Sequence, residues 1–380
     1  MLRGSVAIVG VAEYGLGVAP EGSTPVDVMG NAALGALDDA GLGAADVDGL
    51  FAASTQLPWA SVNLGEWLGV QPRYSDSTQL GGSSFMAHLH HAALAITGGA
   101  CEVAVIGYGS TQRSVGRAKA SVQEIDPGEA PYRPMNPVTA YALAASRHMY
   151  EFGTTREQLA EVAVAARRWA QRNPNAWSKK DLSVQDVLDA PMVADPLGVK
   201  DCCLVTDGGA AVVVTSAERA RSLTDKPVYL LGAGEAHSHR HISHMPDLVR
   251  TSAVDSGARA FEMAGLTPGD VDVLQLYDAF TITPILFLED LGFCAKGEGG
   301  PFVSGGRIAP GGELPLNTNG GGLSYQHPGM YGLLAIVEAA RQLRGESTGQ
   351  VDGAHVALAH GNGGVLSTQC TVVLGDATTV

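Results

Sequence analysis

The sequence predicts an α/β fold of two similar βαβαβ-type halves, stacked as five layers in the order α/β/α/β/α. The first reason is an internal repeat: residues 36–50 are echoed at 260–274, with eight identical positions that include Ala-Gly-Leu and Asp-Val-Asp. The second reason is that helix-like and strand-like segments alternate around each copy. Strands separated by helices indicate a mixed, largely parallel sheet covered on both faces, and two such units pack through like elements.

Each half shows the same series of elements. A strand leads into a helix that ends at a glycine, and a buried strand follows the Asp-Val-Asp turn. A glycine-rich turn, a long apolar helix, a strand and a β-rich ending complete the series. In the first half these segments lie at 6–9, 36–50, 81–84, about 85–98, 103–107 and 208–214. In the second half they lie at 228–231, 260–274, 320–324, about 330–344, 356–359 and 371–375.

The two series place the halves at residues 1–222 and 223–380, with the boundary near 219–226. The first half carries an insertion, about 111–200, which we expect to form a loop domain. It contains a helix at 155–172 that is followed by the stop signal Asn-Pro-Asn. An insertion on a rigid scaffold usually shapes a pocket.

Composition narrows the class of function. The chain has 380 residues, 45% of them apolar, and a formal net charge of −15, so we expect an ordinary core and no binding to nucleic acid or an anionic membrane surface. No stretch approaches about 20 consecutive apolar residues, and the first residues lack a secretion-signal layout, so a cytoplasmic location is expected. The five cysteines fit neither a disulfide framework nor a zinc site, and no metal is expected.

Four motifs follow one another along this duplicated framework. They are Asp-Cys-Cys-Leu-Val-Thr-Asp-Gly-Gly-Ala-Ala at 201–211, Leu-Tyr-Asp-Ala-Phe at 276–280, Asn-Thr-Asn-Gly-Gly-Gly at 317–322 with His-Pro at 327–328, and His-Gly-Asn-Gly-Gly at 360–364. With the repeat, they resemble the thiolase superfamily over essentially the whole chain, and most of all its sterol-carrier-protein thiolase-like branch. The resemblance implies the thiolase fold and a homodimer.

The resemblance also defines what this chain lacks. True thiolases carry a nucleophilic cysteine just before the first glycine-rich turn, and the matching position here falls at or near Leu80. Their second cysteine corresponds to His360, their Gly-His-Pro histidine is kept as His327, and an asparagine of theirs is replaced by Tyr277. Without a thiolate no acyl-enzyme forms, so thiolysis through a covalent intermediate is disfavoured.

These replacements resemble the steroid side-chain-cleaving aldolases of the same superfamily. That resemblance implies retro-aldol cleavage of a β-hydroxyacyl-CoA with a bulky acyl chain, such as a steroid side chain. Coenzyme A would then enter only as part of the thioester, with no covalently bound cofactor. The resemblance carries catalytic tyrosines over to Tyr277 and, by the nearest match, to Tyr325, beside His327 and His360. It also implies a small partner subunit with an OB-fold and a zinc ribbon.

The residues themselves fit this chemistry. A retro-aldol cleavage needs a base for the β-hydroxyl, a group that stabilises the enolate and an acid for the α-carbon. Tyr277 ends a buried strand, His327 precedes a helix and His360 ends an apolar strand, although each position also suits a satisfied core residue. The turns at 81–84 and 320–322 suit an oxyanion hole built from their backbone N–H groups, close packing of the two halves, or both. Which side chain acts as base and which as acid stays open.

Two groups of basic residues each allow two interpretations. A histidine cluster follows the first strand of the second half, and a pocket rim or interface loop is favoured there over a metal site, because no cysteine or carboxylate is interleaved. Its members are His237, His239, His241 and His244. The insertion helix carries three arginines that either reach CoA phosphates or form a solvated face, which is favoured. They are Arg167, Arg168 and Arg172.

The cysteines leave a second activity open. Cys202 and Cys203 are expected to begin a buried strand with a structural role. Cys294 lies near a site motif, so a thiolase or acyltransferase that uses this thiol is the first alternative. A non-catalytic subunit that binds acyl-CoA is the second.

Overall fold

The computed structural model describes residues 2–116 and 126–380, and a nine-stranded sheet forms its centre. The order across this sheet is β3-β2-β4-β7-β1-β8-β11-β10-β9, and β5 and β6 form a separate hairpin. The strands are β1 (Val6–Gly17), β2 (Gly49–Ala52), β3 (Tyr74–Asp76), β4 (Val103–Ser110), β5 (Met192–Ala194), β6 (Leu197–Gly198), β7 (Asp207–Ser216), β8 (Val228–His237), β9 (Val273–Leu276), β10 (Val356–Gly363) and β11 (Thr368–Gly375).

The strand order repeats between the halves. From the outer edge inward, the first half runs β3-β2-β4-β7-β1 and the second runs β9-β10-β11-β8. Leu316 bridges in parallel to Leu274 of β9 and so takes the place that β3 has in the first half. The halves join where β1 and β8 pair antiparallel at Ala7–Tyr229 and Ile8–Val228. The predicted α/β fold class is confirmed, but the sheet is not largely parallel, because five of the eight strand pairings in its described part are antiparallel.

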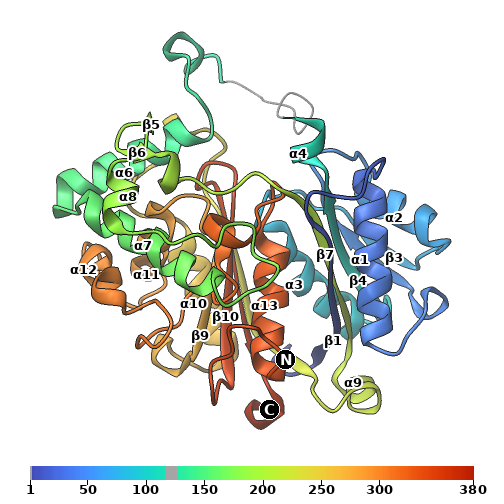
Figure 1. Cartoon of the computed structure of the whole chain (residues 1–380). Coiled ribbons are helices and arrows are strands. Elements are labelled where there is room, and N and C mark those ends of the chain that lie inside the picture. The colour runs from blue at the N-terminus through green and yellow to red at the C-terminus, as the bar shows by residue number, and fades with distance from the viewer. Residues whose placement is uncertain (1, 117–125) are drawn as a thin grey trace.

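Helices on both sides of the strands complete the layers (Figure 1). α3 (Ser84–Thr97) and α13 (Gly332–Arg344) lie in the middle, where each contacts strands of both halves. α1 (Pro25–Asp39) and α2 (Ala60–Leu68) cover the outer face of the first half. α10 (Ala253–Ala264) covers the outer face of the second, with α11 (Ile282–Asp290) beside it.

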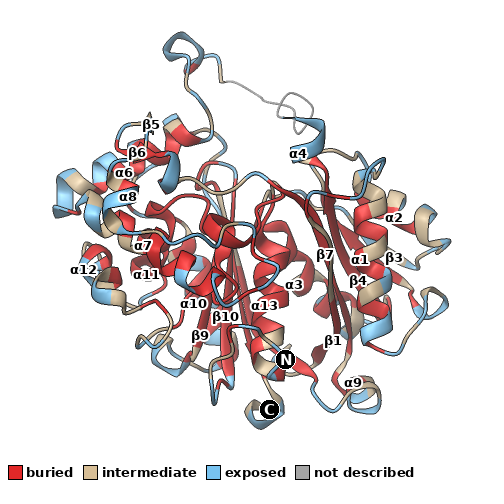
Figure 2. Cartoon of the chain, viewed as in Figure 1, coloured by how far each residue is buried: buried red, intermediate tan, exposed pale blue. Residues whose placement is uncertain are grey.

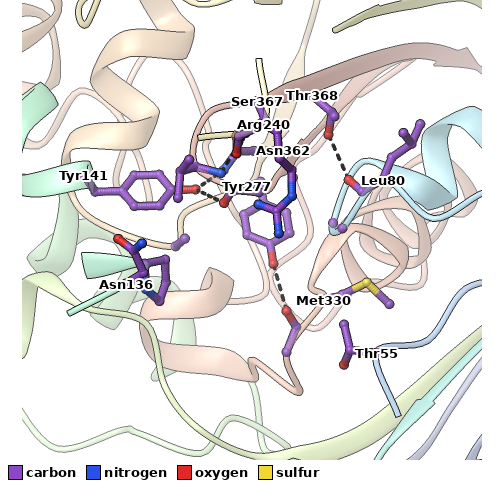
Figure 3. Close-up of a pocket in the computed structure, with 18 of the residues that line it drawn as sticks. Thr55, Leu80, Asn136, Tyr141, Arg240, Tyr277, Met330, Asn362, Ser367 and Thr368 are labelled. Atoms are coloured by element: carbon purple, nitrogen blue, oxygen red, sulfur yellow. Dashed lines mark hydrogen bonds between the residues drawn. The ribbon is translucent and has the colours of Figure 1, made fainter. Parts of the chain in front are cut away.

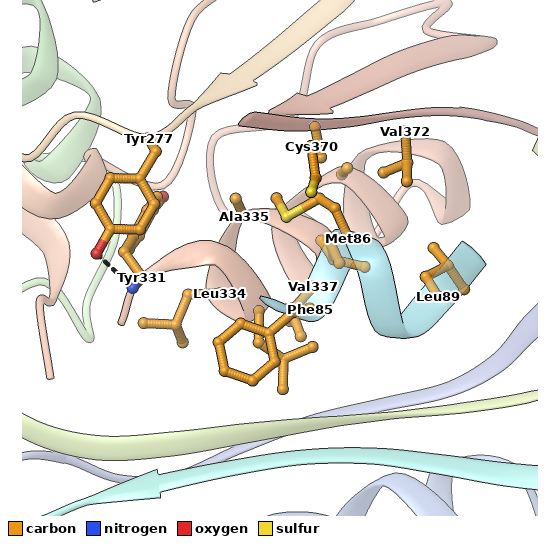
Figure 4. Packing of buried hydrophobic residues seen from close by; sticks show 14 of the residues in the cluster. Phe85, Met86, Leu89, Tyr277, Tyr331, Leu334, Ala335, Val337, Cys370 and Val372 are labelled. Atoms are coloured by element: carbon orange, nitrogen blue, oxygen red, sulfur yellow. Dashed lines mark hydrogen bonds between the residues drawn. The ribbon is translucent and has the colours of Figure 1, made fainter. Parts of the chain in front are cut away.

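The central helices belong to the most buried part of the protein (Figure 2). Phe85 and Leu89 of α3 and Leu334 and Val337 of α13 are fully buried in this layer (Figure 4). Gly332 lets the start of α13 come close to the turn before α3, because an added Cβ would lie 2.0 Å from the backbone oxygen of Gly82. The packing therefore brings the start of α13 against the first glycine-rich turn.

The repeated sequence motif has a structural cause. Gly41 and Gly265 follow the equivalent helices in the left-handed region, with φ values of 66° and 65°, which glycine adopts without strain. Asp48 and Asp272 each accept two backbone hydrogen bonds, at 2.8 and 2.9 Å, from the start of the neighbouring strand, β4 or β10. In each half the motif therefore ends one helix and holds the start of a neighbouring strand, β4 or β10.

The insertion packs mainly on the second half. α6 (Val138–Phe152) contacts α11, and α7 (Arg156–Ala170) contacts α12 (Gly299–Val303) and the π-helical turn Gly321–Tyr325. Thr155 caps α7 through the backbone N–H of Gln158, and the helix ends at Ala170, close to the prediction. Among the described residues, the remaining α-helices are α4 (Gln112–Val115), α8 (Val184–Leu188) and α9 (Ala217–Leu223).

One local expectation is wrong. Cys202 and Cys203 do not begin a strand, because β7 starts at Asp207 and Cys202 forms only an isolated bridge with Phe280. Within the described ranges, none of the helices has the length and apolar character needed to cross a bilayer.

Candidate active site

A pocket of about 600 Å³ lies beyond the carboxyl ends of β9 and β10, where both halves and the insertion meet (Figure 3). Binding sites gather at this edge in open α/β sheets. The first half contributes a glycine turn, the insertion contributes helix α6, and the second half contributes loops that follow its strands. The side chains and turns that matter most below are Gly81, Gly82, Tyr141, Tyr277, His327 and Asn362.

Tyr277 follows β9 directly, and its backbone N–H donates to the carbonyl of His360 in β10 at 3.0 Å. Its hydroxyl oxygen lies 3.0 Å from Nε2 of His327 and accepts the backbone N–H of Tyr331 at 3.2 Å (Figure 4). Burial raises the pKa of Tyr277 well above its ordinary value. Tyr277 therefore keeps its proton at rest and can pass it to the imidazole.

His327 lies in the loop before α13, where residues of the first half hold it. Its backbone N–H donates to Oγ1 of Thr206 at 3.0 Å, and its carbonyl accepts Nε2 of Gln112 at 3.1 Å. Burial lowers the pKa of His327 to about 4, so the ring is neutral at physiological pH. The pocket thus holds a neutral phenol next to a neutral imidazole, the arrangement of a proton relay.

The first glycine turn leaves no room for side chains. A Cβ on Gly81 would lie 2.9 Å from the Cα of Gly363, and one on Gly82 would lie 2.0 Å from the ring of Tyr277. The preceding Leu80 also lines the pocket, so this turn offers backbone and an apolar side chain but no thiol. The expected loss of the nucleophile therefore agrees with the pocket lining.

The second glycine turn differs from the first, and its contacts favour packing over an oxyanion hole. The N–H of Gly321 donates to Oδ1 of Asn319 at 2.8 Å, and the N–H of Gly322 donates to Oδ1 of Asp278 at 2.6 Å. These donors are occupied, and the turn does not line the pocket. Burial raises the pKa of Asp278 to about 7 in spite of these bonds.

Comparisons with known proteins fit this geometry. Residues 234–376 match the family model described as "Thiolase C-terminal domain-like". The chain is 43% identical over 231 residues to an acetyl-CoA acetyltransferase of Methanothermobacter thermautotrophicus, a match that covers 60% of each protein. It is 35% identical over 300 residues to the 17-hydroxy-3-oxo-4-pregnene-20-carboxyl-CoA lyase of Mycobacterium tuberculosis, covering 74% of this chain and 77% of that protein.

The chain belongs to the thiolase superfamily.

Two further similarities narrow its place among thiolase-like proteins. It is 33% identical over 288 residues to a steroid side-chain-cleaving aldolase of Thermomonospora curvata, covering 71% of this chain and 73% of that protein. A solved structure named Ltp2-ChsH2(DUF35) aldolase superposes with a TM-score of 0.89 at 30% identity, covering 99% of this chain and 98% of that one. The resemblance to aldolase-like members of the superfamily, expected from the motifs, is confirmed.

Within this thiolase-superfamily protein, the pocket brings together only two of the four predicted catalytic side chains, Tyr277 and His327. Tyr325 is buried beside Glu13 and Arg341 and does not line the pocket. His360 is also fully buried outside the lining, with Nδ1 2.8 Å from Oγ1 of Thr371 and Nε2 2.9 Å from Oε1 of Gln369. Neither side chain is placed to touch a substrate.

Sequence reasoning missed several polar residues at the pocket, and two of them contact each other. Tyr141 comes from α6 of the insertion, and Asn362 belongs to the last of the four motifs, where only the glycines and His360 were singled out. Nδ2 of Asn362 donates to the Tyr141 hydroxyl at 2.7 Å, so the two side chains are held together. No repeat or spacing pointed to Tyr141, because its approach depends on how the insertion packs.

The histidine cluster contributes to the pocket rim. His239 and His241 line the pocket together with Arg240, and Nε2 of His239 lies 2.9 Å from the carbonyl of Val365. In the part of the chain that the structure describes, no group of three or more His, Cys, Asp or Glu side chains could hold a metal ion. The rim position is the one favoured from the sequence.

The positions of Arg167 and Cys294 support neither a phosphate contact nor a reactive thiol. Arg167 is buried, with Nε 3.0 Å from Oγ of Ser324, so it neither reaches a phosphate nor lies on a solvated face. Cys294 does not line the pocket, whereas Cys203 does. Burial raises the pKa of the Cys203 thiol far above its ordinary value, which disfavours a thiolate there.

Proposed function

We propose that this protein is a carbon–carbon lyase that cleaves a β-hydroxyacyl-CoA by retro-aldol chemistry, without a cysteine nucleophile. The observation that carries the proposal is the neutral pair of Tyr277 and His327, whose Oη and Nε2 atoms lie 3.0 Å apart. They share a pocket in which Leu80 occupies the position of the thiolase nucleophile. Relatives named as a lyase and as a side-chain-cleaving aldolase support the same activity.

The proposed reaction begins at the β-hydroxyl. Tyr277 takes its proton while passing its own to Nε2 of His327, because a buried phenol is not a resting phenolate. The β-carbon becomes a carbonyl as the Cα–Cβ bond breaks, and the bonding pair moves onto the thioester as an enolate. The proton then returns through Tyr277 to the α-carbon. One β-hydroxyacyl-CoA gives one carbonyl compound and one shortened acyl-CoA, and neither water nor free CoA is consumed.

The proposed substrate is a CoA thioester with a bulky apolar acyl chain, such as a steroid side chain. Apolar groups line much of the pocket, among them Phe280, Met330 and Val365. Arg240 places a guanidinium at the rim, the group best suited to pair with a phosphate of CoA. We propose that CoA enters only within this thioester and that no covalently bound cofactor takes part.

We further propose a cytoplasmic homodimer that works with a small partner subunit carrying an OB-fold and a zinc ribbon. The solved aldolase to which the chain is similar has a name that joins two components.

The deciding experiment is an assay of the complex co-purified from native cell extract. It is incubated with a panel of β-hydroxyacyl-CoA and β-ketoacyl-CoA thioesters, each with and without free CoA. Formation of a carbonyl product and a shortened acyl-CoA without free CoA is the expected result. Strict dependence on free CoA with β-ketoacyl substrates would mean a thiolase and would overturn the proposal.

A thiolase or acyltransferase is the second candidate, because Cys203 lines the pocket and one relative is named an acetyl-CoA acetyltransferase. The raised pKa of Cys203 opposes it. Intact-mass analysis of protein quenched during incubation with acetoacetyl-CoA separates the two. We expect no added acyl group, and an acetyl adduct on Cys203 would favour the thiolase.

A further inference from the structure

A second tyrosine faces the substrate pocket from the insertion. The ring of Tyr141 packs on Phe280, with centroids 4.4 Å apart, and its hydroxyl lies beside Asn362 and the carbonyl of Gly364 (Figure 3). Nδ2 of Asn362 donates to the hydroxyl oxygen at 2.7 Å, and the hydroxyl donates to the Gly364 carbonyl at 3.1 Å. Tyr141 is therefore held at a fixed point in the same pocket as Tyr277.

Behind Asn362, a chain of buried hydrogen bonds runs into the protein. Oδ1 of Asn362 accepts Nε2 of Gln369 at 2.9 Å, and Oε1 of Gln369 lies 2.9 Å from Nε2 of His360. Nδ1 of His360 lies 2.8 Å from Oγ1 of Thr371, which in turn lies 2.9 Å from Oγ of Ser256. All of these side chains are almost completely buried, so water does not compete for their bonds.

The Gln369 amide fixes the direction of this chain, because its Nε2 also donates to the carbonyl of Leu366 at 3.1 Å. Because the Asn362 amide donates to Tyr141, its oxygen faces Gln369, and the Gln369 oxygen must face His360. His360 then carries its proton on Nε2 and accepts the Thr371 hydroxyl on Nδ1. Every donor in the chain points toward the pocket, and the last one is the hydroxyl of Tyr141.

This arrangement makes Tyr141 a donor and not a base. Its oxygen already accepts one hydrogen bond, and the amides behind it cannot take up a proton. Tyr277, by contrast, adjoins an imidazole that can. A fixed hydroxyl of this kind suits an oxygen that gains negative charge during the reaction.

We propose that Tyr141 is a further catalytic residue that donates a hydrogen bond to the thioester oxygen as the enolate forms, and that His360 is a positioning residue acting on it through Gln369 and Asn362. The inference rests on the proposed lyase function. In the reaction the electron pair of the Cα–Cβ bond moves to the thioester oxygen, and the Tyr141 proton turns from Gly364 toward that oxygen without being transferred.

The first test is Tyr141→Phe in the co-purified complex, assayed on 17-hydroxy-3-oxo-4-pregnene-20-carboxyl-CoA. We expect kcat to fall about 100-fold with KM within about threefold, the effect of removing one donor to a developing oxyanion. Tyr150→Phe, an exposed tyrosine on the same helix, is the matched control and should leave both constants unchanged. A kcat for Tyr141→Phe within about threefold of the unmodified protein would overturn the catalytic role.

The second test asks whether His360 acts through Tyr141. His360→Leu should lower kcat about tenfold, and the double variant with Tyr141→Phe should be no slower than Tyr141→Phe alone, because a broken chain has nothing left to position. His360→Gln keeps a donor toward Gln369 and should recover most of the loss. If the two substitutions lower kcat by factors that multiply in the double variant, His360 has only a structural role. If His360→Leu does not fold, Gln369→Met breaks the same chain one step nearer the pocket.

These tests distinguish a failure of the Tyr141 proposal from a failure of the proposed lyase function. If the complex thiolyses acetoacetyl-CoA instead, the lyase proposal fails, but the same variants are measured in thiolysis, which also places charge on a thioester oxygen. A loss of kcat there would support Tyr141 on its own. A complex that turns over neither substrate class would overturn both proposals.

Discussion

At the scale of single residues, burial controls the chemistry of the pocket. It raises the pKa of Tyr277 and lowers that of His327 to about 4, so both effects favour the uncharged form. A neutral pair can exchange a proton when a substrate hydroxyl arrives, without first removing a charge from water. The pocket is therefore prepared for proton transfer rather than for a thiolate attack.

Removing the Tyr277 hydroxyl should remove this transfer. We expect Tyr277→Phe to lower kcat by about 10³-fold, within the usual range for a positioned acid–base group, while acyl-CoA binding measured by calorimetry stays within about threefold. The phenylalanine ring fills the same space, so circular dichroism and the melting temperature serve as controls for folding. Unchanged turnover would instead favour a non-catalytic acyl-CoA-binding subunit.

The low pKa of His327 has a visible effect on the pH profile. Because its ring protonates only near pH 4, the pair stays competent well below the ordinary histidine value of about 6.5. We expect kcat/KM to be level from about pH 5.5 to 9, and the raised pKa of Tyr277 predicts no alkaline loss in that range. An acid limb with a midpoint near pH 6.5 would contradict a buried, neutral His327.

The sequence predicted residue types at the site better than their positions in space. Tyr277 and His327 were found because each lies in a motif, Tyr277 directly after β9 and His327 in the loop before α13. His360 lies in an equally specific motif, yet its ring turns into the protein against Phe287, with centroids 4.5 Å apart. Tyr141 has no motif at all, since its place depends on long-range packing of the insertion.

At the scale of elements, the repeat is a folding signal rather than a binding motif. Asp48 and Asp272 occupy equivalent positions, and each holds the first backbone N–H groups of a neighbouring strand. Elements with this internal duplicate were predicted in order, and most begin near their predicted first residue, but β1 and β8 continue well past their predicted ends at 9 and 231. The short strands β5 and β6 of the insertion have no duplicate and too few residues for a period, so they were not predicted.

The equivalent hydrogen bonds of Asp48 and Asp272 should contribute equally to the free energy of unfolding. We expect Asp48→Ala and Asp272→Ala each to lower the free energy of unfolding by about 1–3 kcal/mol, because two backbone donors lose a charged acceptor. Urea denaturation measures this loss, with Asp38→Ala on an exposed helix surface as the matched control. If one variant is as stable as the control, the two turns do not share a role.

At the scale of the whole molecule, His91 links the halves. Its Nδ1 lies 2.7 Å from Asp76 of β3, and its Nε2 lies 3.3 Å from Glu235 of β8, which also contacts His90. Hydrogen bonds to Asp76 and then to Glu235 raise the pKa of His91 to about 9, while these contacts lower the pKa of Glu235 to about 2. A charged histidine therefore bridges an edge strand of one half and the first strand of the other.

This bridge predicts a loss of stability in mild alkali. The bridge contributes fully to the free energy of unfolding below about pH 6.5, the pKa of histidine in the unfolded chain. This contribution is lost as the pH rises through 9. We expect the free energy of unfolding to fall by about 1–2 kcal/mol between these values, after allowance for the solvent that reaches the ring. Urea denaturation of His91→Gln should show a smaller fall over the same range, and an equal fall would assign the effect to other groups.

The two glycine turns show what a duplicated chain gains. Asp278, which binds the backbone of the second turn, aligns in the repeat with Ser54, whose hydroxyl accepts N–H groups of its own loop, from Gln56 and Leu57. The duplicated turns therefore have separate tasks: Asp278 fixes the second turn inside the framework, whereas the first turn lines the pocket and leaves no room for side chains.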